Sequence, residues 1–412
     1  MTIRRRDRGL SGDDMGCDGS RVSGDDLLER LRGVPGAAPV FDALADVPGV
    51  WVVGGAVRDA LLGHRPRDLD LVVEGDAEAV ARLLGEDAVV HDRFGTATAV
   101  GEVNIAATRR ERYARPGALP DVELGVPLRE DLERRDFSVN TLAVRLADGE
   151  LEAVPGALDD LSGRRLRALH ARSFLDDPTR LLRLVRYGAR LRFQIEQETR
   201  LWAFAAVADG ALGTVTGARL GAELRLLLRE PQPAAMCGLE GLRIGPQLLP
   251  GFGVDPDLVE GAQRLIPEDG RADLVALAAC CLDAGAAELA QRLDWLEFTA
   301  RERDVLVAAA TRARSLAPVM GGIDSASGLW ALLRREAPET VALAGGLGAR
   351  EAARKWLEDV RGVRLAIDGD DLVAAGLSGP AVGRALDAAM AAALDGEAVD
   401  REAQLRVALQ AE

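Results

Sequence analysis

With 412 residues, the chain is long enough for about two to four domains, and its 48% hydrophobic content is sufficient for several packed cores. Its net charge of −15 at pH 7 excludes a protein that binds nucleic acid over its whole surface, because phosphate binding depends on Lys and Arg. No stretch reaches 18 uncharged apolar residues, so we expect no membrane-spanning helix. The four cysteines show neither C-x-x-C spacing nor a disulfide framework, which predicts reduced thiols in the cytoplasm.

The first part of the chain combines a polar extension with a helical lead-in and a strand. Residues 1–24 are rich in Gly, Asp, Arg and Ser and are predicted to be disordered. Apolar residues at helical spacing over 27–44 then predict helices, interrupted at 33–35. The β-favouring run 50–53 ends at two glycines, 54–55, which is typical of a strand that leaves its sheet through a tight turn.

Two carboxylates follow on the next predicted strand. A helix is expected over 56–62 and a strand over 68–73, and the strand carries Asp68 and Asp70. Because side chains alternate across a strand, both carboxylates are expected on one face, about 7 Å apart at their backbones. Mg²⁺ prefers hard oxygen ligands, and backbone N–H groups at a helix start bind anions. The combination indicates phosphoryl transfer; the alternative is a solvated strand edge beside an ordinary turn.

Mixed strand and helix patterns continue to about residue 153 and predict an α+β domain over 25–154. They predict a helix and three short strands, over 77–84, 88–91, 97–100 and 103–107. A stretch rich in Pro and Gly, 114–127, has two interpretations, a mobile flap or an ordinary surface connection. Glu111, just before it, also has two: a third acidic group of the site, or a partner of the neighbouring arginines.

Beyond residue 155 the strand pattern disappears, and long helical patterns predict an all-α remainder. We place soft domain boundaries that divide it into 155–231, 232–365 and 366–412. The stretch 155–229 contains 13 arginines and 8 acidic residues, a local charge of +5 inside an acidic chain. This excess predicts an electrostatic groove for RNA between the domain at 155–231 and the preceding one.

The most informative helical motif begins at Asp177. This residue precedes Pro178 and a helical run, which is typical of a helix start and places Asp177 and Arg180 one turn apart. A carboxylate only accepts hydrogen bonds and a guanidinium only donates them, so the pair matches the edges of cytosine and adenine but not of uracil or guanine. A missed buried partner typically costs about 1–3 kcal/mol, which is enough for strong selection. Arg183 and Arg186 follow at three-residue steps, and Arg186 turns away toward phosphate or a neighbouring helix.

Several of these motifs resemble one known family. The residues GGAVRDALLGHRPRDLDLVV (54–73) are similar to the head-domain signature of class II tRNA nucleotidyltransferases and bacterial poly(A) polymerases, a branch of the DNA polymerase β-like superfamily. EDLERRDFSVN (130–140) resembles the family's DL-x-RRDFTINA segment, and DDPTR (176–180) its E-D-x-x-R nucleotide-recognition motif. AVPGALDDL (153–161) stands at the family's hinge element but lacks its first Asp and second Gly.

The resemblance implies an α+β nucleotidyltransferase head with a DNA polymerase β-like mixed sheet (25–154), followed by an all-α neck (155–231), body (232–365) and tail (366–412). It implies that Asp68 and Asp70 are catalytic and hold Mg²⁺. The nucleotide-binding residues that it implies are Gly55, Arg58, Arg135, Asp177, Arg180, Arg183 and Arg186. The implied reaction is template-independent addition of C and/or A to the tRNA 3′ end from CTP and ATP, with release of pyrophosphate.

Three alternatives stay open at this point: a poly(A) polymerase, a specialist that adds only CC or only A, and a catalytically inactive RNA-binding relative. The segments PGALP (116–120) and DLDLVVEGD (68–76) look more like the split CC-adding and A-adding subgroup. Intact Asp68, Asp70 and Arg180 argue against an inactive relative. We expect a cytoplasmic protein without membrane association, whose partners are the tRNA 3′ end, CTP and ATP; its oligomeric state is not indicated.

Overall fold

The computed structural model describes residues 23–66, 68–85, 89–91, 96–99 and 103–411, so nearly all of the predicted extension 1–24 lies outside the described residues. The chain divides into two compact units. Unit 1 consists of Met1–Arg110, Glu123–Glu133 and Asn140–Pro155, and unit 2 of Glu111–Val122, Arg134–Val139 and Gly156–Glu412. Within the described ranges, no helix is both long and apolar enough to cross a membrane.

Unit 1 is built on a mixed sheet that has, in its described part, the strand order β3-β4-β5-β2-β1-β8-β9. The strands are β1 (Val50–Val53), β2 (Asp70–Val73), β3 (Val89–His91), β4 (Thr96–Ala99), β5 (Val103–Ala107), β8 (Leu142–Arg145) and β9 (Leu151–Ala153). Only β2 and β5 pair in parallel; the other neighbours are antiparallel. The predicted mixed sheet is therefore confirmed, although the sequence interpretation did not identify β8 and β9.

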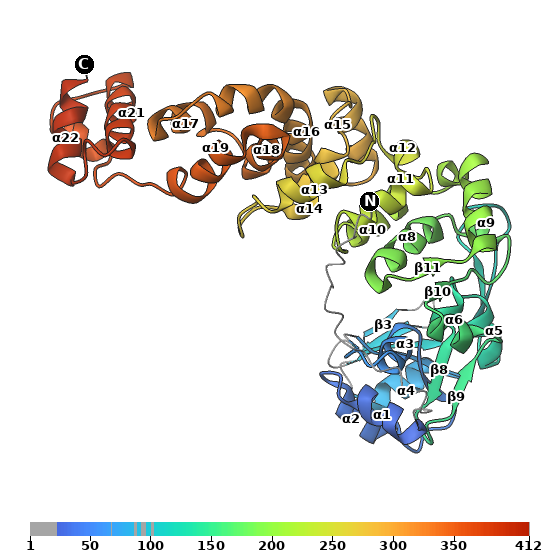
Figure 1. Cartoon of the computed structure of the whole chain (residues 1–412). Helices are drawn as coiled ribbons and strands as arrows, with labels where there is room; N and C mark the ends of the chain where they lie inside the picture. The colour runs from blue at the N-terminus through green and yellow to red at the C-terminus, as the bar shows by residue number, and fades with distance from the viewer. Residues whose placement is uncertain (1–22, 67, 86–88, 92–95, 100–102, 412) are drawn as a thin grey trace, which may run out of the picture. The chain divides into compact units, whose positions relative to one another are not determined.

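Helices cover both faces of this sheet. They are α1 (Gly24–Arg32), α2 (Ala37–Leu44), α3 (Gly55–Leu61), α4 (Ala77–Leu83) and α5 (Leu128–Glu133). Leu128 and Leu132 of α5 pack with Trp51 and Val53 on one face. The alternating residue Val52 points to the opposite face and is fully buried as well. Figure 1 shows α1 to α4 grouped beside the strands of this unit, where α3 contacts β1 and β8.

A separate two-stranded sheet lies between β5 and α5 in sequence. It consists of β6 (Arg109–Arg112) and β7 (Asp121–Leu124), so the stretch 114–127 is not a loop throughout. β7 is four residues long and mostly exposed, and charge pairing stabilises it: Arg110 Nη1 donates to Glu123 Oε2 at 2.6 Å. A strand this short gives too little of an alternating pattern to be recognised in the sequence. The boundary between the two units passes through this β6–β7 hairpin.

Beyond residue 155 the described chain is helical, as predicted, except for one short strand pair. β10 (Arg165–Leu166) and β11 (Gln194–Ile195) pair in parallel, which corrects the expectation of an all-α remainder. Two-residue strands show no alternating pattern, so periodicity does not detect them.

The helices and helical turns from η1 onward are η1 (Ser138–Asn140), α6 (Ala157–Ser162), α7 (Ser173–Asp176), α8 (Thr179–Leu191), α9 (Gln197–Ala208), η2 (Ala211–Thr214), α10 (Gly217–Leu227), α11 (Ala234–Gly241), α12 (Gly245–Leu248), α13 (Pro256–Gln263), α14 (Ala272–Ala279), α15 (Ala286–Trp295), α16 (Ala300–Gly321), α17 (Ala326–Leu333), α18 (Pro338–Ala344), η3 (Gly345–Ala349), α19 (Arg350–Lys355), η4 (Trp356–Val360), α20 (Gly369–Ala374), α21 (Pro380–Leu394) and α22 (Arg401–Gln410). The last three share a core around Leu372 and Ala389. The boundaries at 231 and 365 stay predictions.

Candidate active site

One edge of the sheet in unit 1 brings the glycine turn and the aspartates together. β1 and β2 are antiparallel with Val52 opposite Leu71, so the end of β1 and the start of β2 lie at the same edge. Gly54 leaves β1 with φ 72° and ψ −127°, a conformation that strongly favours glycine, and Gly55 begins α3. The turn and Asp70 therefore meet where the sequence pattern placed them.

The two carboxylates at this edge are open to solvent. Asp68 and Asp70 are exposed and Leu69 between them is buried, although β2 begins only at Asp70. Asn104 Nδ2 donates to Asp70 Oδ1 at 3.2 Å, because β5 pairs in parallel with β2 at this position. Among the described residues, no group of three or more His, Cys, Asp or Glu forms a metal cluster. Two exposed carboxylates still fit Mg²⁺, which is commonly held by one or two carboxylates plus substrate phosphates.

Arg58, predicted to approach phosphate, is buried inside unit 1. Its side chain is 2% exposed; Nη1 donates to Asn140 Oδ1 at 2.6 Å and Nε donates to Asp59 Oδ1 at 2.8 Å. A Cβ atom at Gly55 would lie 3.5 Å from Nη2 of Arg58, so the guanidinium sits directly behind the glycine turn. The structure therefore places a fixed positive charge behind the turn.

In unit 2, Arg180 occupies the first turn of α8 and is also buried. Its Nη1 donates to Ser173 Oγ at 2.7 Å, and its Nη2 donates to the carbonyl oxygen of Arg134 at 2.8 Å. The guanidinium is thus oriented by α7 and by the segment around Arg134, which is far from α8 in sequence. Arg135, next to Arg134, is half-buried, and its contact with a nucleotide stays a prediction.

Asp177 lies at the junction of α7 and α8, and its Oδ1 atom accepts three hydrogen bonds. Thr179 donates two of them, from its backbone N–H at 3.1 Å and from Oγ1 at 2.7 Å, and Arg219 Nη2 donates the third at 2.9 Å. Within the described part of the chain, none of these donors reaches Oδ2. The structure therefore fixes one oxygen of Asp177 and leaves the other able to accept a hydrogen bond.

Arg183 and Arg186 belong to an ion-pair network inside unit 2. Arg183 Nε donates to Asp136 Oδ2 at 2.8 Å, and the nearby Asp136 carboxylate raises the pKa of this guanidinium. Arg186 lies 3.4 Å from Glu223 Oε2 on α10 and 5.0 Å from the centre of the Tyr187 ring. Arg186 thus reaches a neighbouring helix, one of its two predicted directions; nucleotide contact by either arginine stays a prediction.

Glu111 pairs with an arginine, as one of its two interpretations predicted; a role as a third acidic group of the site stays a prediction. Only 7% of its side chain is exposed; it accepts from Tyr113 Oη at 2.8 Å and from Arg134 Nη1 at 3.0 Å. Burial raises the pKa of the Tyr113 hydroxyl, and the charges of Glu111, Arg180 and Asp177 also act on it. Tyr113 therefore lies near the Asp177–Arg180 pair. The sequence analysis missed it because no local pattern predicts which separate segments meet.

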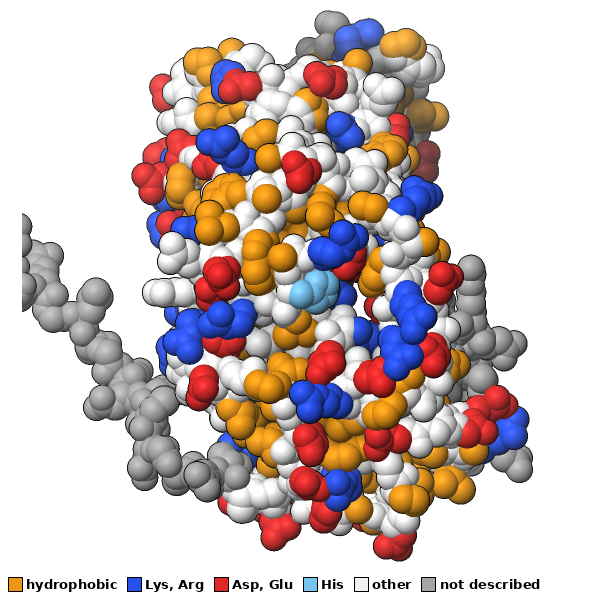
Figure 2. Space-filling view, turned by 90° about the vertical axis from the view of Figure 1, so that its right-hand side faces the viewer, with side chains coloured by type: hydrophobic (Ala, Val, Ile, Leu, Met, Phe, Trp, Pro, Cys, Tyr) orange, Lys and Arg blue, Asp and Glu red, His pale blue; other side chains and the backbone are white. Residues whose placement is uncertain are grey.

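The positive excess of the stretch 155–229 is partly neutralised. Seven of its arginines pair with acidic side chains: Arg165, Arg167, Arg172, Arg183, Arg186, Arg190 and Arg219. Four are exposed and have no acidic partner among the described residues: Arg164, Arg192, Arg200 and Arg229. Figure 2 shows blue and red side chains interspersed over the face that it presents. The predicted RNA groove stays a prediction, with these four arginines as its candidates.

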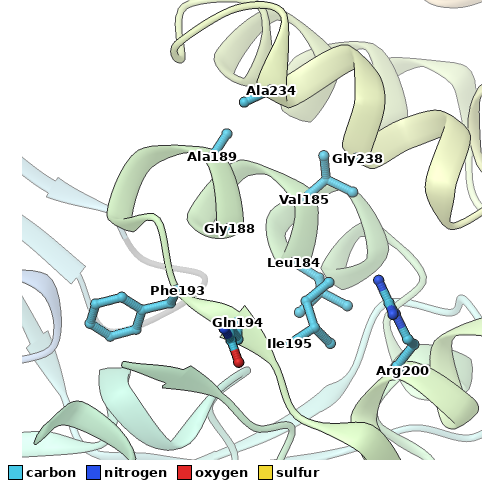
Figure 3. Close-up of a pocket in the computed structure, with 10 residues that line it drawn as sticks. All are labelled: Leu184, Val185, Gly188, Ala189, Phe193, Gln194, Ile195, Arg200, Ala234 and Gly238. Atoms are coloured by element: carbon cyan, nitrogen blue, oxygen red, sulfur yellow. The ribbon is translucent and has the colours of Figure 1, made fainter. Parts of the chain in front are cut away.

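A separate pocket of about 370 Å³ opens beside α8, β11 and α11 in unit 2 (Figure 3). It is lined by Leu184, Val185, Gly188, Ala189, Phe193, Gln194, Ile195, Arg200, Ala234 and Gly238. Asp177 and Arg180 are not among its lining residues, so the pocket is separate from that pair.

Comparisons with known proteins agree with these observations. Residues 50–167 match the family model of the poly(A) polymerase head domain. An A-adding tRNA nucleotidyltransferase of Geobacter sulfurreducens is 34% identical over 398 residues, which are 88% of this chain and 45% of that protein. A CC-adding tRNA nucleotidyltransferase of Deinococcus radiodurans is 44% identical over 213 residues, 49% of this chain and 55% of that protein. The chain thus spans about half the length of these two relatives.

A further relative matches over nearly its whole length. The multifunctional CCA protein of Xanthomonas campestris is 32% identical over 409 residues, 84% of this chain and 98% of that protein. Among solved structures, the Thermotoga maritima CCA-adding enzyme complexed with tRNA has a TM-score of 0.76 at 28% identity and covers 94% of this chain and 98% of its own. A CCA-adding enzyme in complex with CTP has a TM-score of 0.77 at 27% identity, with the same coverage of 94% and 98%.

Proposed function

The chain belongs to the class II tRNA nucleotidyltransferase family, and from this premise we propose that it adds C and/or A to the 3′ end of tRNA without a template. The substrates are CTP and ATP, and pyrophosphate is released. The observation that carries the proposal is the Asp177–Arg180 pair, in which one acceptor oxygen and an anchored guanidinium match the edges of cytosine and adenine. The relatives are named as A-adding, CC-adding and multifunctional CCA proteins, which supports CTP and ATP as the substrates.

In unit 1, Asp68 and Asp70 would hold Mg²⁺. This ion, when bound, polarises the reacting oxygens and neutralises charge on the triphosphate. Gly55 has no side chain, so phosphate can approach the backbone of the turn, and Arg58 supplies positive charge behind it. The carboxylates orient the reacting groups, and the turn binds the triphosphate.

In unit 2, Oδ2 of Asp177 accepts from the amino group of cytosine or adenine, and Arg180 donates to the adjacent ring nitrogen. Uracil and guanine carry a carbonyl oxygen and an N–H group at these positions, so each sets acceptor against acceptor and donor against donor. A buried mismatch of this kind costs about 1–3 kcal/mol for each contact. Two contacts therefore discriminate by roughly 30-fold or more.

The remaining assignments follow from this reaction. We propose that Arg135 contacts the nucleotide, that the neck (155–231) selects the base, and that the tail (366–412) contacts RNA. Free tRNA and nucleoside triphosphates occur together in the cytoplasm, which is where this activity would take place. The body (232–365) would connect neck and tail.

Product sequencing tests the proposal. The purified chain is incubated with tRNA transcripts that end before CCA, after C and after CC, with each nucleoside triphosphate alone and with CTP and ATP together. We expect C, A or both to be added, in one to three steps, with little use of UTP or GTP. A long A tail from ATP alone would instead identify a poly(A) polymerase, and no incorporation from any nucleotide would identify an inactive relative.

A further inference from the structure

One arginine on α10 joins the base-selecting carboxylate to the tip of the β6–β7 hairpin. Arg219 Nη2 donates to Asp177 Oδ1 at 2.9 Å, and its Nη1 donates to the carbonyl oxygen of Gly117 at 3.2 Å. Only 28% of the side chain is exposed, so both bonds are partly shielded from water. The planar guanidinium can hold two acceptors at a fixed separation, which an ammonium group cannot do.

Arg219 differs from the other donors to Asp177. Thr179 is two residues from Asp177 and moves with it, so its two hydrogen bonds hold the carboxylate only relative to its own turn. Among the described residues, Arg219 is the one donor to Asp177 from another element. The terminal torsion of an aspartate is soft, so this bond adds an anchor from outside the turn to the two bonds from Thr179 and helps to fix where Oδ2 points.

The hairpin tip is itself closely packed within unit 2. Gly117 donates its N–H to the Leu175 carbonyl oxygen of α7 at 3.1 Å. Its φ of +68° favours glycine, and a Cβ atom at this position would lie 2.2 Å from Oγ1 and 2.6 Å from the backbone oxygen of Thr214. This contact leaves no room for a side chain, so the Gly117 carbonyl faces Arg219 in a defined position.

We propose that Arg219 is a positioning residue for base selection. By holding Oδ1 of Asp177 it directs Oδ2 at the amino group of the incoming base, and the docked tip at Gly117 keeps the Arg219 guanidinium in place. The inference rests on the proposed function, because it concerns how that reaction distinguishes one base from another. Without Arg219, Asp177 keeps only the two hydrogen bonds within its own turn, so its carboxylate is held less firmly and a base with a carbonyl oxygen at this position is penalised less.

The test measures selection rather than activity alone. For the full-length chain, kcat/KM is determined with CTP, UTP, ATP and GTP, and the ratios CTP to UTP and ATP to GTP are compared among variants. We expect Arg219→Ala to lower at least one ratio by about tenfold or more, while incorporation of the correct nucleotide falls less. Arg219→Lys should give an intermediate ratio, because an ammonium group donates from a single nitrogen and does not reproduce the planar fork that holds both acceptors.

Two further variants separate positioning from general loss of structure. Arg225 lies on the same helix and donates to two carbonyl oxygens, of Leu296 and Glu297, so Arg225→Ala is the matched control and should keep both ratios. Gly117→Ala displaces the hairpin tip without changing Arg219 and should lower a ratio by less than Arg219→Ala. Thermal unfolding of each variant monitors the fold, and if Arg219→Ala does not fold, the ratios of Arg219→Lys decide.

The inference would be overturned, while the proposed function stands, if the folded Arg219 variants kept the wild-type CTP-to-UTP and ATP-to-GTP ratios. It would also be overturned if Arg225→Ala lowered these ratios as much as Arg219→Ala does. Wild-type protein that incorporates no nucleotide would overturn the proposed function and, with it, this inference. A fall in correct incorporation at constant ratios would show that Arg219 has only a structural role, which also overturns it.

Discussion

In unit 1 the backbone alone places Asp68 and Asp70 at the edge of a sheet, whereas in unit 2 Arg180 is oriented by Ser173 and by the carbonyl of Arg134. The first pair is exposed, and the second site is buried and cross-linked by hydrogen bonds. A site placed by strand register is lost when its ligands are removed, but tolerates changes around them. A site held by a network should lose function by degrees as each contact is removed.

The largest effect is expected from Asp70→Ala. Loss of one of the two carboxylates removes half of the charged oxygen ligands, so incorporation should fall by at least about 1000-fold while tRNA affinity stays near that of the wild type. Pyrophosphate release and a tRNA binding titration measure the two quantities. Glu78→Ala, which removes a partly exposed acid of α4 that pairs with Arg82, is the control and should retain activity. Substantial turnover by Asp70→Ala would contradict the metal-binding role.

The same contrast explains what the sequence could predict. Val50–Val53, the glycine turn and Asp70 are close in sequence, and strand alternation together with turn chemistry suffices to place them. The spacing of Asp177 and Arg180 likewise follows from one helix start. Three further residues reach this pair from separate segments: Ser173, Tyr113 and Arg219. The two strands of the β6–β7 hairpin are paired partly by charges. Local periodicity predicts neither these contacts nor this hairpin.

Arg180→Lys tests the network directly. Lysine keeps the charge but has one nitrogen in place of the two that bind the Ser173 hydroxyl and the Arg134 carbonyl, so kcat/KM for CTP and ATP should fall by about 10- to 100-fold. Steady-state kinetics with each nucleotide measure the change. Arg172→Lys is the control, because Arg172 is exposed and lies 3.4 Å from Asp176 on α7. An equal loss in both variants would mean that the Arg180 contacts have no special role.

Asp160→Asn tests whether a second set of hydrogen bonds in unit 2, centred on the Asp160 carboxylate, stabilises the fold. The Asp160 carboxylate accepts from Ser138 Oγ at 2.8 Å, Arg165 Nε at 3.1 Å and Arg167 Nε at 2.9 Å. Burial acts to raise its pKa, but the hydrogen bonds from Arg167, Ser138 and Arg165 outweigh burial and hold the pKa below its usual value. The charged form therefore stabilises the fold, and we expect Asp160→Asn to cost about 1–3 kcal/mol of unfolding free energy at pH 7.

The stability difference between the wild type and Asp160→Asn should depend on pH in a defined direction. Because the folded pKa of Asp160 is lowered, its contribution is complete above the unfolded pKa of about 4 and is lost as the pH falls through the folded pKa. The stability difference from wild type should thus shrink below about pH 4, as measured by urea unfolding at pH 7 and pH 3. Asp159→Asn, at an exposed position of the same helix, should change stability little at either pH. A difference that grows on acidification would contradict this assignment.

The smallest effect is expected from Arg200→Ala, at an exposed position in unit 2. Arg200 has no acidic partner among the described residues, so its charge is available to a phosphate group, whereas Arg172 already pairs with Asp176. Removal of one phosphate contact should weaken tRNA binding a few-fold and reduce the slope of log affinity against log salt by about 1. A titration with tRNA at several salt concentrations measures both, and Arg172→Ala should change the slope less. An unchanged slope in Arg200→Ala would remove Arg200 from the RNA-binding surface.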